Sequence, residues 1–123
     1  MKLRVRGNSL RLRLSRSEVE TFDHVGRVEE AVRFGPGAQF VYAMERTPDG
    51  ALSARLEGAL VTVSIPAALA DSWCRTEQVG LEADQPTGDG QTMRILIEKD
   101  FTCLKTRSGE DESDAFPNPH DHC

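Results

Sequence analysis

The most constraining feature of this chain is an alternation of apolar and polar residues that changes phase between residues 2 and 14. Leu3 and Val5 occupy odd positions, whereas the three leucines that follow occupy even positions. A period of two is typical of a β-strand, and the change of phase indicates a two-residue loop between paired strands. Gly7-Asn8 suits a type II′ turn, because glycine adopts the positive φ needed at its first central residue. We therefore predict a β-hairpin in which Val5 faces Leu10.

Two short helices are expected in the rest of the chain. Ser15 and Glu18 have the form of a capping box, in which each side chain binds an unpaired backbone amide at the start of a helix. Pro66 is well suited to begin a second helix, because its missing amide hydrogen is not needed in the first turn. Leu69 and Trp73 lie four residues apart on one side of this helix, so we expect that side to pack under a sheet.

Segments with a period of two continue beyond the first helix, separated by glycine and proline turns. They lie near residues 28–34, 39–46, 51–57, 60–65, 79–83 and 92–99, and the first four are expected to form a meander. The predicted fold class is α+β, a mainly antiparallel twisted β-sheet of about seven to eight short strands with two short helices. We predict that residues 1–108 form a single β-rich domain and that residues 109–123 form an acidic tail that folds back on it. The sequence shows no internal repeat.

The predicted hairpin concentrates positive charge on one face. Its register places Arg4 opposite Arg11 and Lys2 opposite Arg13, and like charges across a strand pair repel. An acidic group is therefore expected over this face. The candidate residues for docking an anionic partner or the tail are Arg4, Arg6, Arg11 and Arg13. Glu98 and Asp100 share one face of the last predicted strand and are candidates to meet the hairpin in a cleft, although a solvated edge explains them equally well.

The acidic run near the end of the chain is the expected partner of this hairpin. Surface ion pairs contribute only about 0–1 kcal/mol each. Burial of one phenylalanine contributes about 1.5–3 kcal/mol, so an aromatic anchor is needed. A solvated free tail and a calcium or magnesium site are the alternatives. The predicted latch consists of Glu110, Asp111, Glu112, Asp114 and Phe116.

Cysteine and histidine residues gather at the same end of the chain. Thiolates and neutral imidazoles are the ligands that zinc prefers, so a zinc or similar divalent metal site is one interpretation. A frayed terminus, a disulfide or redox pair of the two cysteines and a catalytic thiol are the others. The candidate ligands are Cys103, His120, His122 and Cys123.

Several segments together resemble a small uncharacterised bacterial family, a domain of unknown function. The resemblance rests on residues 1–9, Arg11–Leu14, Ile97–Phe101, Glu110–Asp114 and Phe116–Pro119. It spans nearly the whole chain and implies a single-domain bacterial protein. The resemblance implies no particular activity.

Composition and motifs narrow the function classes. A net charge of −5 opposes dedicated nucleic-acid binding, because phosphate contacts need a cationic surface. No segment approaches the ~20 apolar residues of a membrane span, so we expect no membrane partner and a cytoplasmic location with reduced thiols. The sequence has no phosphate loop, nucleophile elbow or HExxH motif, which disfavours an enzyme. A non-enzymatic binding or regulatory module is therefore favoured, as a monomer or small homo-oligomer. The alternative is a metal-handling protein.

Overall fold

Strands dominate the structure, a computed structural model that describes residues 1–101 and 116–117. The described residues form eight strands and two helices, which confirms the predicted α+β class. In chain order the elements are β1 (Lys2–Arg6), β2 (Ser9–Leu14), α1 (Arg16–Val25), β3 (Arg27–Gly35), β4 (Ala38–Thr47), β5 (Ser53–Glu57), β6 (Leu60–Pro66), α2 (Ala67–Arg75), β7 (Gly80–Pro86) and β8 (Thr92–Lys99).

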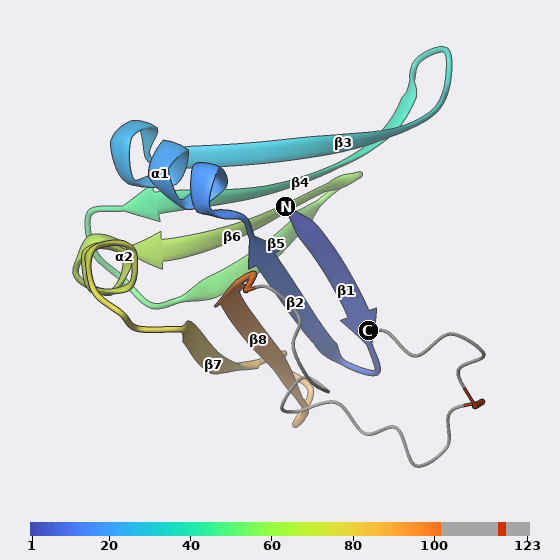
Figure 1. The fold of residues 1–123 in the computed structure, drawn as a ribbon. Helices are drawn as coiled ribbons and strands as arrows, with labels where there is room; N and C mark the ends of the chain where they lie inside the picture. The colour runs from blue at the N-terminus through green and yellow to red at the C-terminus, as the bar shows by residue number, and fades with distance from the viewer. Residues whose placement is uncertain (102–115, 118–123) are drawn as a thin grey trace.

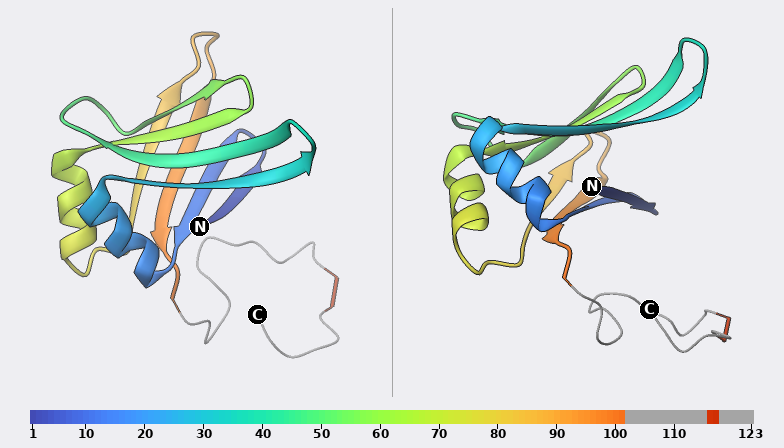
Figure 2. Two further views of the ribbon diagram at one scale, coloured as in Figure 1. Left: turned by 90° about the horizontal axis from the view of Figure 1, so that it is seen from above. Right: turned by 45° about the horizontal axis from the view of Figure 1, so that its top comes forward.

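The strands divide into two four-stranded sheets that form two layers (Figure 1). Sheet A has the order β1-β2-β8-β7, and sheet B has the order β3-β4-β6-β5. Their apolar inner faces meet in one core, and the two helices lie together at one end of the layers (Figure 2). No helix among the described residues is long and apolar enough to cross a membrane.

The predicted meander is wrong at its third strand. β4 pairs in parallel with β6, and β5 lies at the edge of sheet B, where it pairs with β6 alone. The physical reason lies in the burial of β6, in which every residue from Thr62 to Pro66 is buried. Such a strand needs a neighbour on each side, so it takes the interior position that the meander gives to β5.

The β1–β2 hairpin has the predicted register. Val5 pairs with Leu10, and the cationic pairs are Arg4 with Arg11 and Lys2 with Arg13. Gly7 has a φ of 55°, and Asn8 does not have a positive φ, because no described residue other than glycine does. A positive φ at the first central residue alone is what a type II′ turn requires.

The helices begin and pack largely as the sequence indicates. The Ser15 amide donates to Glu18 at 2.8 Å, and the Ser15 hydroxyl accepts from the Glu18 amide, which completes the capping box. Trp73 is fully buried and meets the Phe22 ring edge-on at 6.4 Å between centroids. Leu69 is 42% exposed, so the expectation that it shares the buried side of α2 is wrong. Ala70 takes that place beside Trp73.

The fold contains a repeat that the sequence does not reveal. The first half of the chain runs β1-β2-α1-β3-β4, and the second half runs β5-β6-α2-β7-β8. Strands β1 to β4 of the first half correspond in order to β5 to β8 of the second half. When each strand of sheet A is replaced by its counterpart, the result is sheet B in reverse order, with the same parallel and antiparallel pairs. The registers therefore assign each position a counterpart in the other half.

Contacts around the two helices follow this relation. Phe22 on α1 is the counterpart of Trp73 on α2, and Arg46 on β4 is the counterpart of Lys99 on β8. The Arg46 guanidinium lies 5.7 Å from the Phe22 ring centroid, and the Lys99 ammonium lies 5.8 Å from that of Trp73. The same cation–π contact thus occurs in each half, although the residues differ.

Candidate functional site

The outer face of sheet A carries the cations that the sequence singled out. Because side chains alternate along a strand, β1 presents Lys2, Arg4 and Arg6 on this face, and β2 presents Arg11 and Arg13. The antiparallel register sets these residues side by side, so the hairpin forms one cationic surface. The three β1 cations are exposed, whereas Arg11 and Arg13 are half-buried.

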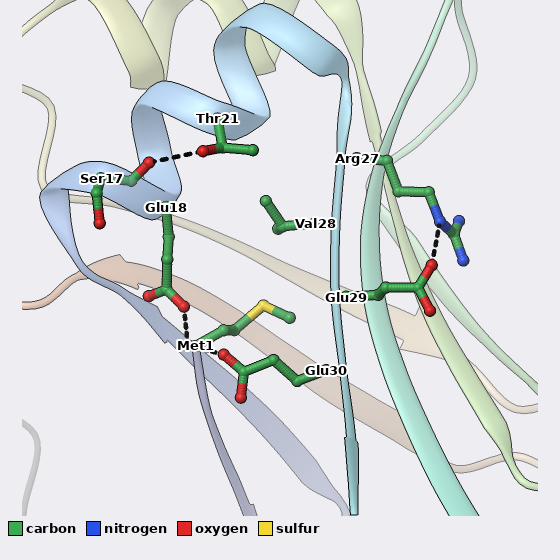
Figure 3. Close-up of a pocket in the computed structure, with 8 residues that line it drawn as sticks. All are labelled: Met1, Ser17, Glu18, Thr21, Arg27, Val28, Glu29 and Glu30. Carbon is green, nitrogen blue, oxygen red and sulfur yellow. Dashed lines mark hydrogen bonds and ion pairs between the residues drawn. The ribbon is translucent and has the colours of Figure 1, made fainter.

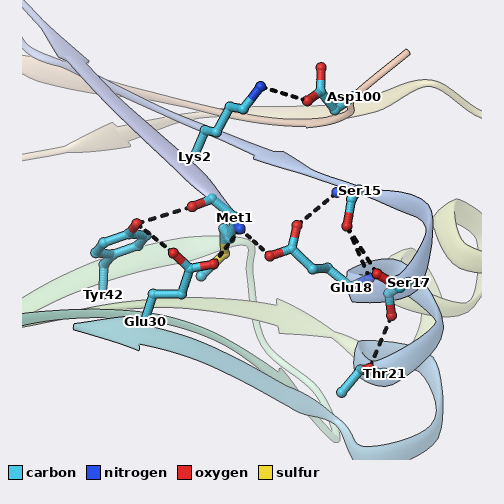
Figure 4. Close-up of polar contacts among 9 residues, drawn as sticks. All are labelled: Met1, Lys2, Ser15, Ser17, Glu18, Thr21, Glu30, Tyr42 and Asp100. Carbon is cyan, nitrogen blue, oxygen red and sulfur yellow. Dashed lines mark hydrogen bonds and ion pairs between the residues drawn. The ribbon is translucent and has the colours of Figure 1, made fainter. Parts of the chain in front are cut away.

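Two acids from the end of β8 balance part of this charge. The Arg11 Nε lies 2.9 Å from Glu98 Oε1. The Lys2 ammonium lies 3.0 Å from Asp100 Oδ2, and Figure 4 shows this second contact. Parallel pairing of β2 with β8 brings these groups together, because it places Glu98 beside Arg13. The expected acidic neighbours are therefore present among the described residues. Among the described residues, five cations and these two carboxylates therefore share the hairpin side of this face.

A hollow of about 510 Å³ adjoins the hairpin on the same face. Leu96 and Gly80 lie among its lining residues beside Arg11. Gly80 has no side chain for a steric reason, because a Cβ atom there would lie 2.8 Å from the Ile97 carbonyl oxygen. At the far side, Arg94 pairs with Glu82 at 2.7 Å. The face thus offers an apolar patch between a cationic hairpin and a charged border.

The outer face of sheet B carries different side chains at the counterpart positions. Arg27 stands where sheet A has Gly80, and its guanidinium lies 2.9 Å from Glu45. Glu45 also pairs with Arg55 at 3.3 Å, so charged side chains cross the sheet from edge to edge. Ala43 and Thr62 lie fully buried on this face. Sheet B is therefore closed where sheet A is open.

A second polar cluster lies on the inner side, between α1 and β3. The Met1 ammonium donates to Glu18 and Glu30, whose side chains converge on it beside a pocket of about 310 Å³ (Figure 3). The Tyr42 hydroxyl lies 3.0 Å from the Met1 carbonyl oxygen and 3.0 Å from Glu30 Oε2 (Figure 4). The sequence indicated Glu18 only as a helix cap, and this cluster was not predicted from it. The capping box was its only local signal.

Electrostatics bind this cluster together. Burial alone would raise the pKa of Glu18, but hydrogen bonds from the Met1 ammonium and from Ser15 outweigh it and lower the pKa to about 2. Burial alone would lower the pKa of the Met1 ammonium, but Glu18 and Glu30 together raise it above its ordinary value of 8.0. A protonated amine held by two carboxylates is a poor nucleophile, so the cluster is suited to anchoring rather than to covalent chemistry.

The described residues include only one residue of the predicted latch. Glu110, Asp111, Glu112 and Asp114 lie outside the described residues. Phe116 is described and is 96% exposed, so the expected burial of its ring is wrong. Without that burial, the ion pairs alone would have to hold the segment, and each contributes little at a surface.

The predicted metal ligands Cys103, His120, His122 and Cys123 also lie outside the described residues. Within residues 1–101 and 116–117, no group of three or more His, Cys, Asp or Glu side chains is placed to hold a metal ion. Cys74 is the free cysteine in this part of the chain, and burial raises the pKa of its thiol. A raised pKa keeps the thiol protonated, which does not favour reactivity.

Comparison with known proteins gives a family but no activity. The model of the family of unknown function DUF7009 matches residues 1–120, so the chain belongs to that family. No curated protein and no solved structure matches the chain. The predicted membership of a family of unknown function is confirmed.

Proposed function

We propose that this member of the DUF7009 family is a non-enzymatic binding module that holds an extended acidic protein segment on the outer face of sheet A. The observation that carries the proposal is the row of hairpin cations beside an open hollow. Guanidinium groups form paired hydrogen bonds with carboxylates, and Arg4, Arg6, Arg11 and Arg13 place four guanidinium groups on one surface, where a partner's carboxylates would compete with those of the chain itself. The proposal places the protein in the cytoplasm, which cell fractionation would test.

The arrangement favours an extended segment over a small ligand. The cationic surface follows two strands, and the hollow continues across β8 to β7, so an occupant must span the sheet. Carboxylates would lie over the hairpin, and one apolar side chain would pack on Leu96 in the gap that Gly80 leaves. Charged contacts of this kind mainly set specificity and the association rate.

The chain carries its own run of carboxylates in Glu110, Asp111, Glu112 and Asp114. We propose that this segment competes with the partner for the hairpin, which would make binding self-inhibited. The proposal rests on chemical complementarity, since those four acids lie outside the described residues.

A binding titration tests both parts. The probe is a fluorescent synthetic peptide that alternates glutamate and aspartate and ends in one phenylalanine. Full-length protein with Glu110→Gln, Asp111→Asn, Glu112→Gln and Asp114→Asn should bind it more tightly than the wild type. Binding should weaken steeply with salt, because exposed charges are screened beyond about 10 Å at 0.1 M ionic strength.

Matched substitutions locate the binding surface. Arg4→Gln in this tail variant should weaken binding, whereas Arg55→Gln, at the counterpart position on sheet B, should not. Equal losses from the two substitutions would show that the peptide senses overall charge and would contradict the proposal. Unchanged affinity after neutralising the tail acids would reject self-inhibition but leave the binding surface standing.

The metal-handling alternative stays a prediction. It requires about one equivalent of bound metal in protein purified without a histidine tag, and loss of that metal on Cys103→Ser. Elemental analysis of purified protein decides it, and metal-free protein would reject it.

A further inference from the structure

β3 is an edge strand of unusual length in this fold. It runs for nine residues at the border of sheet B, whereas the edge strands β1 and β5 have five residues each. The β3–β4 hairpin projects past the other strands of both sheets (Figures 1 and 2). An edge strand leaves alternate backbone amides and carbonyls without a sheet partner, so β3 is a ready template for another strand.

Apolar side chains extend along the projecting part of this edge. Phe34 is 74% exposed and Val32 is 49% exposed, although both belong to the strand whose first half packs against the core through Val28. Two large apolar side chains together at a strand edge indicate a surface that a partner covers.

The other edges of the two sheets are protected. Gln85 on β7 donates its side-chain amide to the Ala54 carbonyl at 2.9 Å and accepts from the Ala54 amide at 2.8 Å, which ties β7 to the edge strand β5. The charged residues of β1 are all cations, Lys2, Arg4 and Arg6, which would repel a second β1, whereas β3 carries charges of both signs. β3 is left as the edge that favours pairing.

The charge order of β3 is self-complementary. When two copies pair antiparallel about Ala31, Glu29 of each copy lies opposite Arg33 of the other, and Glu30 lies opposite Val32. In a symmetric antiparallel pair, the two-fold axis passes through one residue of β3, and residues of the same face lie opposite each other. The registers that compete with the axis at Ala31 are those with the axis at a neighbouring residue. An axis at Glu30 sets the two Glu30 residues against each other and Arg27 against Arg33. Like charges directly opposite destabilise a strand pair. An axis at Val32 sets Arg33 opposite Ala31 and Glu29 opposite Gly35, so it forms no pair of opposite charges, and the axis at Ala31 is favoured.

This register also brings Phe34 to a site that can receive it. The two-fold axis at Ala31 places Phe34 of one copy opposite Val28 of the other, and Val28 lines the pocket between α1 and β3 (Figure 3). Ser17 and Thr21 of α1 form another wall of that pocket. A β-bulge shifts the register between Arg33 and Gly35, so the regular pairing ends at Arg33 and Phe34 stands at its end.

We propose that two copies of this chain pair antiparallel along β3, with the two-fold axis at Ala31 and Phe34 of each copy in the α1–β3 pocket of the other. Sheet B then becomes a continuous eight-stranded sheet across the dimer. The contact is isologous, so it closes at two copies. The outer face of sheet A remains free, which makes this inference independent of the proposed binding function.

Charge reversal in the full-length chain tests the register. The wild type should sediment as a dimer at ~100 μM, whereas Glu29→Arg and Arg33→Glu should each sediment as a monomer, because each creates two like-charge pairs. Mixing the two variants should restore a dimer, since opposite charges then face each other at both contacts between positions 29 and 33. A misfolded variant cannot give this rescue. A monomeric wild type, dimeric single variants or a monomeric mixture would each overturn the proposal.

Truncation of one aromatic ring tests the pocket contact. Phe34→Ala should raise the dimer dissociation constant at least ~tenfold, because two rings leave the interface. Leu56→Ala is the matched control, since Leu56 is 71% exposed at the other edge of the same sheet. It should leave the constant unchanged. Equal effects of the two substitutions, or no effect of Phe34→Ala, would contradict the seating of Phe34.

Discussion

Sheets A and B share one topology but differ in the side chains on their outer faces. On sheet B, Arg27 and Arg55 reach Glu45 from both sides and cover small buried residues. On sheet A, the counterpart of Arg27 is Gly80, so the same position is bare and a hollow opens beside the cationic hairpin. The comparison teaches that one sheet of a repeated fold can close its outer face with ion pairs while the other sheet, built from strands of the same two halves, keeps a hollow there.

The inner faces show a second difference. Around Met1 the first half places Glu18, Glu30 and Tyr42, which bind one another and the ammonium group. The counterparts of these residues in the second half are Leu52, Leu69, Ala83 and Ile95, all of them apolar. The core itself is shared, so polar chemistry has been added to one copy of a common framework. Substitutions at counterpart positions can break or sharpen this comparison.

The largest effect is expected where the two halves are most alike. Phe22→Ala and Trp73→Ala each remove a fully buried aromatic ring, so each should lower the free energy of unfolding by about 3–5 kcal/mol. Urea denaturation measures both. Leu69→Ala is the surface control and should cost less than about 1 kcal/mol. A loss at only one of the two aromatic residues would show that the helices are not equivalent in the core.

The next effect concerns the bare position on sheet A. Gly80→Ala should destabilise the protein by about 1–3 kcal/mol, because its Cβ atom would lie 2.8 Å from a backbone oxygen. Arg27→Ala at the counterpart position should cost about 1 kcal/mol or less, because it loses only surface ion pairs. Thermal melting of both variants checks the order. A harmless Gly80→Ala would remove the steric reason for the open hollow.

The polar cluster should make the stability of the protein depend on pH through Glu18. The folded pKa of Glu18 is about 2 and its ordinary value is 4.5, so its stabilisation is present above pH 4.5 and is lost as the pH falls towards 2. Glu18→Gln should make the melting temperature depend less on pH between about 2 and 4.5. It should also cost about 1.5–3 kcal/mol at neutral pH, through the lost charge-assisted hydrogen bonds. An unchanged acid dependence would show that Glu18 is not ionically bound in solution.

The smallest effect is expected on the closed face. Arg55→Gln should lower the free energy of unfolding by no more than Arg27→Ala does, because Arg55 is half exposed and its ion pairs are screened. High salt should shrink the difference between this variant and the wild type. A loss well above that limit would mean that the ion pairs hold sheet B together rather than cover it.

Local features of the sequence predicted much of this fold. The phase change around Gly7-Asn8 defines the first hairpin to the residue, and the Ser15 and Glu18 pair defines the start of α1. These signals work because turn and cap chemistry depend on near neighbours in the chain. The position of β5 was mispredicted because alternation reports which residues share a face, not which strands lie side by side.

The repeat and the site were predictable to different degrees. Counterparts such as Phe22 with Trp73 or Leu12 with Val63 share apolar character but not identity, so sequence comparison within the chain does not detect them. The cationic hairpin was predictable because strand register sets its charges side by side. The Met1 cluster was not, because it joins β1, α1, β3 and β4 through contacts between distant parts of the chain.

The most direct test of the contrast between the two outer faces is a residue-resolved titration. Backbone amide spectra of isotope-labelled protein with the neutralised tail acids would be recorded while the acidic peptide is added. The account predicts shifts at Arg4, Arg11, Gly80 and Leu96 on sheet A, and none at the counterparts Arg55, Thr62, Arg27 and Ala43 on sheet B. Shifts of equal size on both faces, or shifts confined to sheet B, would contradict it.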